Sequence, residues 1–231
     1  MPRQPRLELP GIPMHVTQRG VNRCAIFLDD EDRQHYKQLL RRACSKHRVQ
    51  IHAFVLMDNH VHLLLSACRA GDIARAMRLA GQSHVQAFNL RHGRSGTLWQ
   101  GRFKSCLVDS DAYLLAVLRY IELNPLRAAM VDCPEAYRWS SVHTHLGHAC
   151  DPMLTTHPAY LALGASADAR AIAYRRWLYE PLSPDQLASI RKHLAQERAL
   201  GNPRFQALVA QALNRSASVR PRGRPRVAEP G

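Results

Sequence analysis

The sequence lacks the marks of a secreted or membrane-spanning protein. No apolar run approaches the roughly 20 residues that a membrane span requires, and the N-terminus has no apolar stretch typical of a signal peptide. The six cysteines are scattered without a C-x-x-C pair, which argues against a zinc knuckle or a disulfide framework and predicts reduced thiols. The chain is therefore expected to be cytoplasmic and to have no membrane partner.

Acidic residues are also scarce. The chain has 18 Asp and Glu against 32 Lys and Arg, which gives a formal net charge of +14. This excess favours a polyanionic partner; nucleic acid is the commonest one, and an anionic membrane surface is the rival. A length of 231 residues is enough for one domain with a sizeable core and an appendage.

A candidate metal half-site lies in a predicted β-hairpin. Two apolar runs, at residues 49–57 and 60–66, flank the polar pair Asp58-Asn59 and predict two strands joined by a tight turn. Side chains alternate across a strand, so His60 and His62 are expected on one face. Two neighbouring imidazoles on a rigid strand suit a divalent metal ion.

A His-x-His pair alone is weak evidence. With 13 histidines in the chain, about one such pair arises by chance, and a second occurs at His143-Thr144-His145. That second pair lies in a polar stretch without a strand pattern and is interpreted as loop. The first pair gains weight because polar side chains inside a Leu-rich strand need a reason.

The order of predicted elements indicates an α+β fold. A first strand, a helix, the hairpin, a helix, a strand and a last helix follow one another at residues 13–20, 31–46, 49–66, 71–92, 102–108 and 112–123. The order β-α-β-β-α-β-α is that of a ferredoxin-like split arrangement with an extra helix. It predicts an antiparallel sheet with helices on one face and an open face for a partner.

The last helix carries two further candidates. Tyr120 and Asn124 are four residues apart and share one helical face, and Pro125 predicts that the helix ends near Asn124. The amide oxygen of Asn124 and the two strand histidines would hold a metal ion, and Tyr120 would attack a polarised phosphorus. The alternative is that Tyr120 only packs, as a tyrosine near a helix end usually does.

Candidate DNA-binding residues lie on or beside the predicted strands and loops. They are Arg19, Arg23, Arg94, Trp99, Arg102 and Lys104. The basic side chains would contact phosphates and Trp99 would stack on an unpaired base. Solvated surface charge and a core tryptophan are the alternatives.

Several motifs, taken together and in this order, resemble the REP-associated tyrosine transposases. These bacterial proteins are related to the IS200/IS605 single-strand transposases within the HUH endonuclease superfamily. The likeness covers roughly residues 9–147. It is carried by residues 60–64 (HVHLL), 98–105 (LWQGRFKS) and 120–128 (YIELNPLRA), with 15–23 (HVTQRGVNR) as the opening strand.

The resemblance implies a ferredoxin-like domain that cleaves and rejoins single-stranded or hairpin DNA with Mg²⁺ or Mn²⁺. It places His60 and His62 on the family's metal-binding histidines, Asn124 on its third ligand and Tyr120 on its nucleophile, which would form a 5′-phosphotyrosine. Leu126, where valine is commoner, is the departure within these motifs. Family members recognise repetitive extragenic palindrome (REP) hairpins, so REP-like DNA in the nucleoid is the expected partner. A monomer or homodimer is expected, with the monomer favoured.

Beyond the catalytic domain, predicted at residues 1–147, the composition changes. A helical appendage over 148–215 is expected to bind DNA or to cap the sheet edge, and its helices are predicted at 169–179, 183–200 and 202–213. A tail over 216–231 is basic and rich in proline, and is predicted to be disordered when free. Its Arg222 and Arg224 resemble an AT-hook, with generic phosphate binding as the alternative.

Two other functions remain open from the sequence. A non-catalytic nucleic-acid-binding module on the same fold would bind without cleavage. A His-x-His phosphoesterase would cleave without a covalent protein–DNA adduct, and the second pair at His143 and His145 is the reason to name it.

Overall fold

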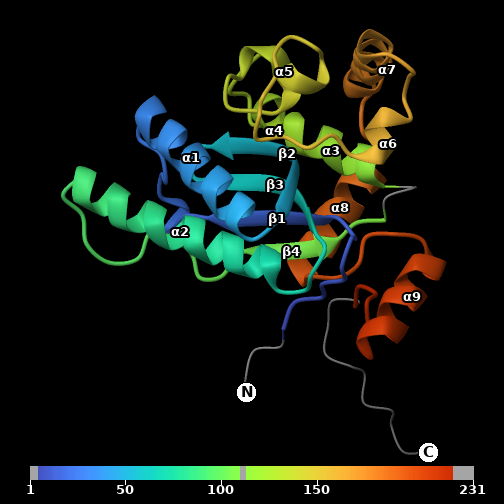
Figure 1. Cartoon of the computed structure of the whole chain (residues 1–231), viewed down its shortest axis with the longest axis horizontal. Helices are drawn as coiled ribbons and strands as arrows, with labels where there is room; N and C mark the ends of the chain where they lie inside the picture. Colours follow the sequence, from blue (N-terminus) through green and yellow to red (C-terminus); the bar gives the residue numbers. More distant parts are fainter. Residues whose placement is uncertain (1–4, 110–112, 221–231) are drawn as a thin grey trace, which may run out of the picture.

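The computed structural model describes residues 5–109 and 113–220, and its centre is a four-stranded antiparallel sheet (Figure 1). The strands are β1 (Met14–Arg19), β2 (Val49–Met57), β3 (His60–Ala67) and β4 (Lys104–Leu107), in the order β2-β3-β1-β4. The hairpin turns at Asp58-Asn59, because Met57 pairs with His60. The α+β ferredoxin-like prediction is confirmed. The predicted tail, including Arg222 and Arg224, lies largely outside the described residues.

Helices α1 (Asp30–Lys46) and α2 (Asp72–Arg91) cover one face of the sheet (Figure 1). Val61 and Leu63 of β3 pack in the core on this face with Tyr36 of α1 and Met77 of α2. The alternation of β3 then leaves His60 and His62 on the other face, as the sequence predicted.

The second face, expected to be open, is covered as well. Helices α3 (Leu114–Glu122) and α8 (Pro184–Gln196) pack there, and Leu64 of β3 and Val55 of β2 lie in a second core with Val117 of α3. The reason lies in β2, which is buried at eight of its nine positions. A strand that is apolar on both faces must be covered on both, so the expectation of an open face was wrong.

The C-terminal half is a series of short helices that return to the sheet. Its elements are α4 (Asn124–Arg127), η2 (Pro134–Ala136), α5 (Val142–His145), α6 (Pro158–Leu161), α7 (Ala167–Tyr179), α8 and α9 (Pro203–Leu213). In the N-terminal half, the short turn η1 (Val21–Arg23) follows β1. The predicted helix over 183–200 ends early, because Glu197 takes a left-handed conformation. The boundary at residue 147 stays a prediction, and contacts cross it, since Val108 pairs with Leu200.

The second His-x-His pair was expected in a loop and is instead helical, in α5. Its His145 is buried, and Nδ1 donates to Oε1 of Glu122 at 2.6 Å. The same fully buried carboxylate accepts from Ser141 Oγ at 2.5 Å and from the Tyr174 hydroxyl at 2.7 Å. Glu122 therefore ties the end of α3 to α5 and α7.

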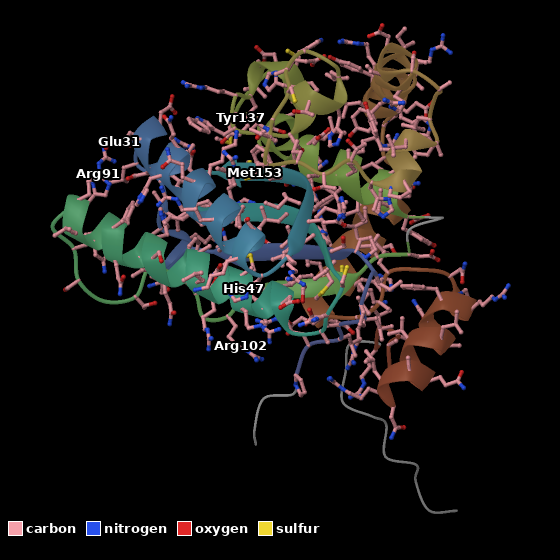
Figure 2. All side chains as sticks on the ribbon, viewed as in Figure 1. Glu31, His47, Arg91, Arg102, Tyr137 and Met153 are labelled. Carbon is pink, nitrogen blue, oxygen red and sulfur yellow. The ribbon has the colours of Figure 1, made fainter. Side chains whose placement is uncertain are left out.

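A partly exposed ionic cluster joins the start of α1 to the end of α2. Arg91 binds Asp29 and Glu31 at 2.7 Å and Asp32 at 2.6 Å. Figure 2 shows Arg91 beside Glu31, at the same end of the two helices. Among the described residues, no helix is long and apolar enough to cross a membrane.

We expect the free energy of unfolding to fall on acidification, in part through His84. This residue is buried against Phe27, Tyr36 and Phe88, and Nε2 donates to the carbonyl of Ile26 at 2.9 Å. Burial lowers the pKa of His84 to about 4, whereas an unfolded histidine titrates near 6.5. Only the unfolded state then takes up a proton between these values, so stability is lost as the pH falls through this window.

Urea unfolding at pH 7 and pH 5 measures the effect. His84 is expected to account for a loss of about 2 kcal/mol between the two. His84→Phe keeps an aromatic ring but cannot titrate, so its loss should be smaller by that amount. An equal loss in the variant would contradict the assignment.

Candidate active site

Most of the predicted site residues line one pocket on the sheet. It has a volume of about 510 Å³ and lies between the sheet, α3 and α8. His60, His62, Tyr120 and Asn124 all line it. Residues from three strands and three helical segments line this pocket, so it forms only when distant parts of the chain pack together.

In each of the two strand histidines, one ring nitrogen is hydrogen-bonded and the other is free to bind a metal ion. Nδ1 of His60 faces Oδ1 of Asn59 at 2.7 Å, and the Asn59 amide nitrogen is used by the carbonyl of Arg23. His60 Nδ1 is therefore the donor, and its Nε2 keeps a lone pair. Burial lowers the pKa of His60 to about 4 and that of His62 well below its usual value. Both imidazoles are neutral at pH 7, which is the ligating form.

His62 has a partner that the sequence did not identify. Nδ1 of His62 lies 2.8 Å from Nε2 of His15, which is fully buried in β1. When His62 donates in this contact, its Nε2 is left free to ligate. The alternation of β1 in the sequence could have shown which face His15 takes. It could not have shown the partner, because the pairing of His15 with Leu64, which makes His62 a diagonal neighbour, depends on the register of the sheet.

Tyr120 lies against these rings. Its ring centroid is 5.8 Å from that of His62 and 5.6 Å from that of His15, both edge-on. Only 6% of the tyrosine is exposed. It therefore approaches the pocket from α3, on the same side of the sheet as the histidines.

Asn124 presents its oxygen and not its nitrogen to the pocket. Its Nδ2 donates to the carbonyl oxygens of Tyr120 at 3.0 Å and Ile121 at 3.3 Å. Carbonyls only accept, so the amide nitrogen must face the helix end and Oδ1 remains available. As predicted, the helix breaks near Pro125: α3 ends at Glu122, and a separate turn begins at Asn124.

A half-buried arginine adds positive charge beside the tyrosine. Arg127 donates through Nη2 to the carbonyl of Tyr120, and its Cζ lies 4.3 Å from the ring centroid. Burial lowers the pKa of Arg127 to about 10, so it is still charged at neutral pH. Sequence reasoning missed this residue, although its place three positions after Asn124 puts it on the same turn.

The donor set suits a divalent ion. Two neutral imidazoles with free Nε2 atoms and one amide oxygen line the same pocket, a mixed nitrogen and oxygen set that Mn²⁺ and Mg²⁺ sites can use. No group of three or more His, Cys, Asp and Glu among residues 5–109 and 113–220 could hold a metal ion. A metal ion held here would therefore need the amide oxygen of Asn124 beside the two imidazoles.

The predicted DNA-binding residues divide into three groups. Arg19, Arg102 and Lys104 line the pocket, with Arg19 and Lys104 on β1 and β4. Arg23 is exposed in η1 next to Asn59. Arg94 lies beyond α2 over the ring of Phe88 and does not line the pocket.

Trp99 does not line the candidate pocket and is not an exposed stacking platform beside it. It is 8% exposed, its Nε1 donates to the carbonyl of Gly81 at 3.0 Å, and its ring lies 5.8 Å from that of His84. Trp99 is mainly a core residue. Arg191 of α8, in the predicted appendage, lines the candidate pocket, and no pattern in the sequence indicates this.

An α+β fold with a polar and basic pocket on its sheet suits an anionic ligand such as nucleic acid, and comparisons identify the family. Residues 10–124 match the family model described as "Transposase IS200 like". Through this segment the chain belongs to the IS200-like transposases, a class of DNA-cleaving enzymes. The predicted family resemblance is confirmed.

Two solved structures are similar to the chain. A REP-associated tyrosine transposase bound to a REP hairpin is 18% identical, with a TM-score of 0.56, over 69% of this chain and 93% of that chain. A putative transposase from Deinococcus radiodurans R1 is 22% identical, with a TM-score of 0.38, over 52% of this chain and 95% of that chain. No curated protein matches the chain. At 18% identity, the likeness to the REP-associated transposase structure shows the fold.

Proposed function

We propose that this protein is a metal-dependent single-strand DNA endonuclease and strand transferase with Tyr120 as its nucleophile. The observation that carries the proposal is the edge-on packing of Tyr120 against His62, in a pocket that also holds His60 and Asn124. Family membership supports it, because IS200-like transposases generally depend on a divalent metal.

The chemistry follows from the residues present. The Tyr120 oxygen attacks a backbone phosphorus, a P–O bond to tyrosine forms, and the bond to the 3′ oxygen breaks. The products are a 5′-phosphotyrosine and a free 3′-hydroxyl, and another 3′-hydroxyl can reverse the step to join strands. Arg127 would stabilise negative charge on the tyrosine side. A bound Mg²⁺ or Mn²⁺, held by His60, His62 and Asn124, would supply Lewis-acid stabilisation of the phosphate.

The proposed substrate is a hairpin with single-stranded flanks. A structure with this fold is a REP-associated transposase bound to a REP hairpin, and the pocket rim carries Arg19, Arg102 and Lys104, which suit phosphates. REP-like DNA of the nucleoid, bound in the cytoplasm by a monomer, is the setting that we propose. The tail residues Arg222 and Arg224 remain candidates for additional phosphate contacts.

The phosphoesterase alternative loses its support. It requires the second His-x-His pair to join the first, but His145 is buried and bonded to Glu122. That pair lines no part of the catalytic pocket.

A gel assay tests the proposal. Hairpin oligonucleotides carrying host repeats, labelled at either end, are incubated with the protein and Mn²⁺ or EDTA. We expect an SDS-resistant protein–DNA adduct that needs Mn²⁺ and retains the label on the 3′ side of the cut, since the protein is attached to the 5′-phosphate. Tight binding without an adduct would overturn the enzyme and leave the non-catalytic binder, and cleavage without an adduct would favour hydrolysis.

Metal binding can be predicted separately from cleavage. His60→Ala removes a ligand and should weaken Mn²⁺ binding by more than about 100-fold, while Asn59→Ala only frees the ring of His60 and should cost about 10-fold. Calorimetry or the Mn²⁺ paramagnetic resonance signal measures both. His143→Ala, in the other His-x-His pair, is the matched control and should leave the affinity unchanged. Equal affinities in all three variants would place the ion elsewhere.

A further inference from the structure

A second cavity lies on the face of the sheet opposite to the catalytic pocket, between α2 and the segment 99–103 that precedes β4. We call it the α2 groove. Its volume is about 760 Å³, within the range of about 300–1,000 Å³ that is usual for small-ligand pockets. Its wall includes Met77, Trp99 and Phe103, so the lining is mainly apolar.

The groove and the catalytic pocket are connected through one residue. Arg102 lines both of them, and Figure 2 shows it at the edge of the molecule below α2. A strand that leaves the catalytic pocket past Arg102 would turn around the β4 edge of the sheet and reach the mouth of the groove.

The rim of the groove is positive. Arg6, Arg75, Arg78 and Arg102 line it, and no carboxylate does so among the described residues. Arg75 is paired with Asp72 at 2.6 Å and Arg6 lies 3.8 Å from Glu197, whereas Arg78 and Arg102 form no ion pair with a described residue. Burial and the neighbouring Arg102 lower the pKa of Arg6, as expected where positive charges gather. Such a rim suits a polyanion.

The wall carries an unused hydrogen-bond acceptor. Gln18 of β1 lines the groove and is only 8% exposed, and its buried Oε1 accepts no hydrogen bond from a described residue. A buried acceptor without a donor is unfavourable. A turn of the Gln18 side chain toward the groove would bring Oε1 to its surface, where an N–H group of a ligand would satisfy it.

Gly81 of α2 allows this arrangement. A Cβ at this position would lie 3.3 Å from Nε1 of Trp99 and 3.6 Å from Nε2 of Gln18. Glycine inside a helix is otherwise unfavourable. Its absent side chain lets the tryptophan and glutamine reach α2 and form the wall.

We propose that the α2 groove holds one unpaired nucleobase of the DNA strand whose backbone enters the catalytic pocket. The base would lie on the apolar wall, with an N–H group of its Watson–Crick edge donating to Gln18 Oε1, and the rim arginines would bind the flanking phosphates. Every base offers such an N–H, and it is free only when the base is unpaired. The proposal rests on DNA being the substrate, as argued above.

Binding of single-stranded probes tests this without any cleavage. Fluorescence anisotropy in EDTA, with the Tyr120→Phe protein, compares four homopolymeric dodecamers with an abasic dodecamer of equal charge. We expect at least one homopolymer to bind about tenfold more tightly than the abasic probe. Absence of any preference for bases would overturn the proposal.

Two variants locate the preference in the groove. Ala74→Phe, from a half-buried position on α2 that lines the groove, fills the space and should remove the tenfold difference between homopolymer and abasic probe. Gln18→Leu keeps the size of the side chain and should lower the preference through the lost hydrogen bond. Thermal unfolding shows whether each variant folds. If Ala74→Phe does not fold, the result for Gln18→Leu tests the proposal. A full preference in the folded variants would place the base elsewhere.

Charge variants separate the rim from the wall. Arg78→Ala should weaken binding to every probe, the abasic one included, and lower the salt dependence by about one counterion. Arg176→Ala, an exposed arginine on the distant α7 (Figure 1), is the matched control and should change neither. If the base preference holds but no covalent adduct forms with metal, the groove stands and the proposed transferase activity fails.

Discussion

Replacing Tyr120 by phenylalanine is expected to abolish covalent attachment to DNA and to lower strand cleavage at least about a thousandfold, since the nucleophile is lost. The variant keeps the ring that packs against His62 and His15, so its stability and its affinity for hairpin DNA should change little. Adduct formation is measured on denaturing gels and affinity by anisotropy, with the same oligonucleotide.

Tyr179→Phe is the matched control. Tyr179 is exposed on α7, and its hydroxyl donates to Glu135 at 2.7 Å, so removing this oxygen should leave the adduct unchanged. Persistence of the adduct in Tyr120→Phe would exclude Tyr120 as the attacking residue. Loss of hairpin binding in that variant would instead assign the residue a role in binding.

Glu122→Gln is expected to lower the free energy of unfolding by about 3 kcal/mol. The carboxylate is fully buried and accepts three hydrogen bonds, from Ser141, His145 and Tyr174. A glutamine turns an NH₂ group toward donors that it cannot satisfy. Urea unfolding at pH 7 measures the loss.

Tyr174→Phe provides the comparison for this network. It removes one donor and leaves the carboxylate with two, so a smaller loss of about 1 kcal/mol is expected. An equal loss in the two variants would show that the Tyr174 bond carries the whole network. Because Glu122 follows Tyr120 by two residues, Glu122→Gln should also slow adduct formation, by loosening the end of α3.

The network gives the C-terminal helices a role that neither sequence alternative described fully. Tyr174 of α7 binds Glu122 at the end of α3, and Arg191 of α8 lines the catalytic pocket. These helices cover the sheet and also position the helix that carries the tyrosine. Whether they bind DNA as well stays a prediction.

Much of the site was within reach of sequence reasoning, because it depends on short-range periodicity. The period of two in β3 put His60 and His62 on one face, and the spacing of four put Tyr120 next to Asn124. The predictions failed where the burial of side chains in the folded protein determined the structure. Trp99 entered the core between α1 and α2, β2 required cover on both faces, and the stretch containing His145 became a helix bound to a buried carboxylate.

The sequence by itself determined the order of strands and helices, the facing of the two histidines, the break at Pro125 and the positive charge, since each follows from local backbone preference or from composition. Only the tertiary structure decided that His15 contacts His62, that Arg127 lies over Tyr120 and that Arg191 reaches the pocket from α8. The reason is that strand register and helix packing are set by the burial of apolar surface across the whole chain. A local pattern shows which face a side chain takes, and the packing of distant segments determines what that side chain meets.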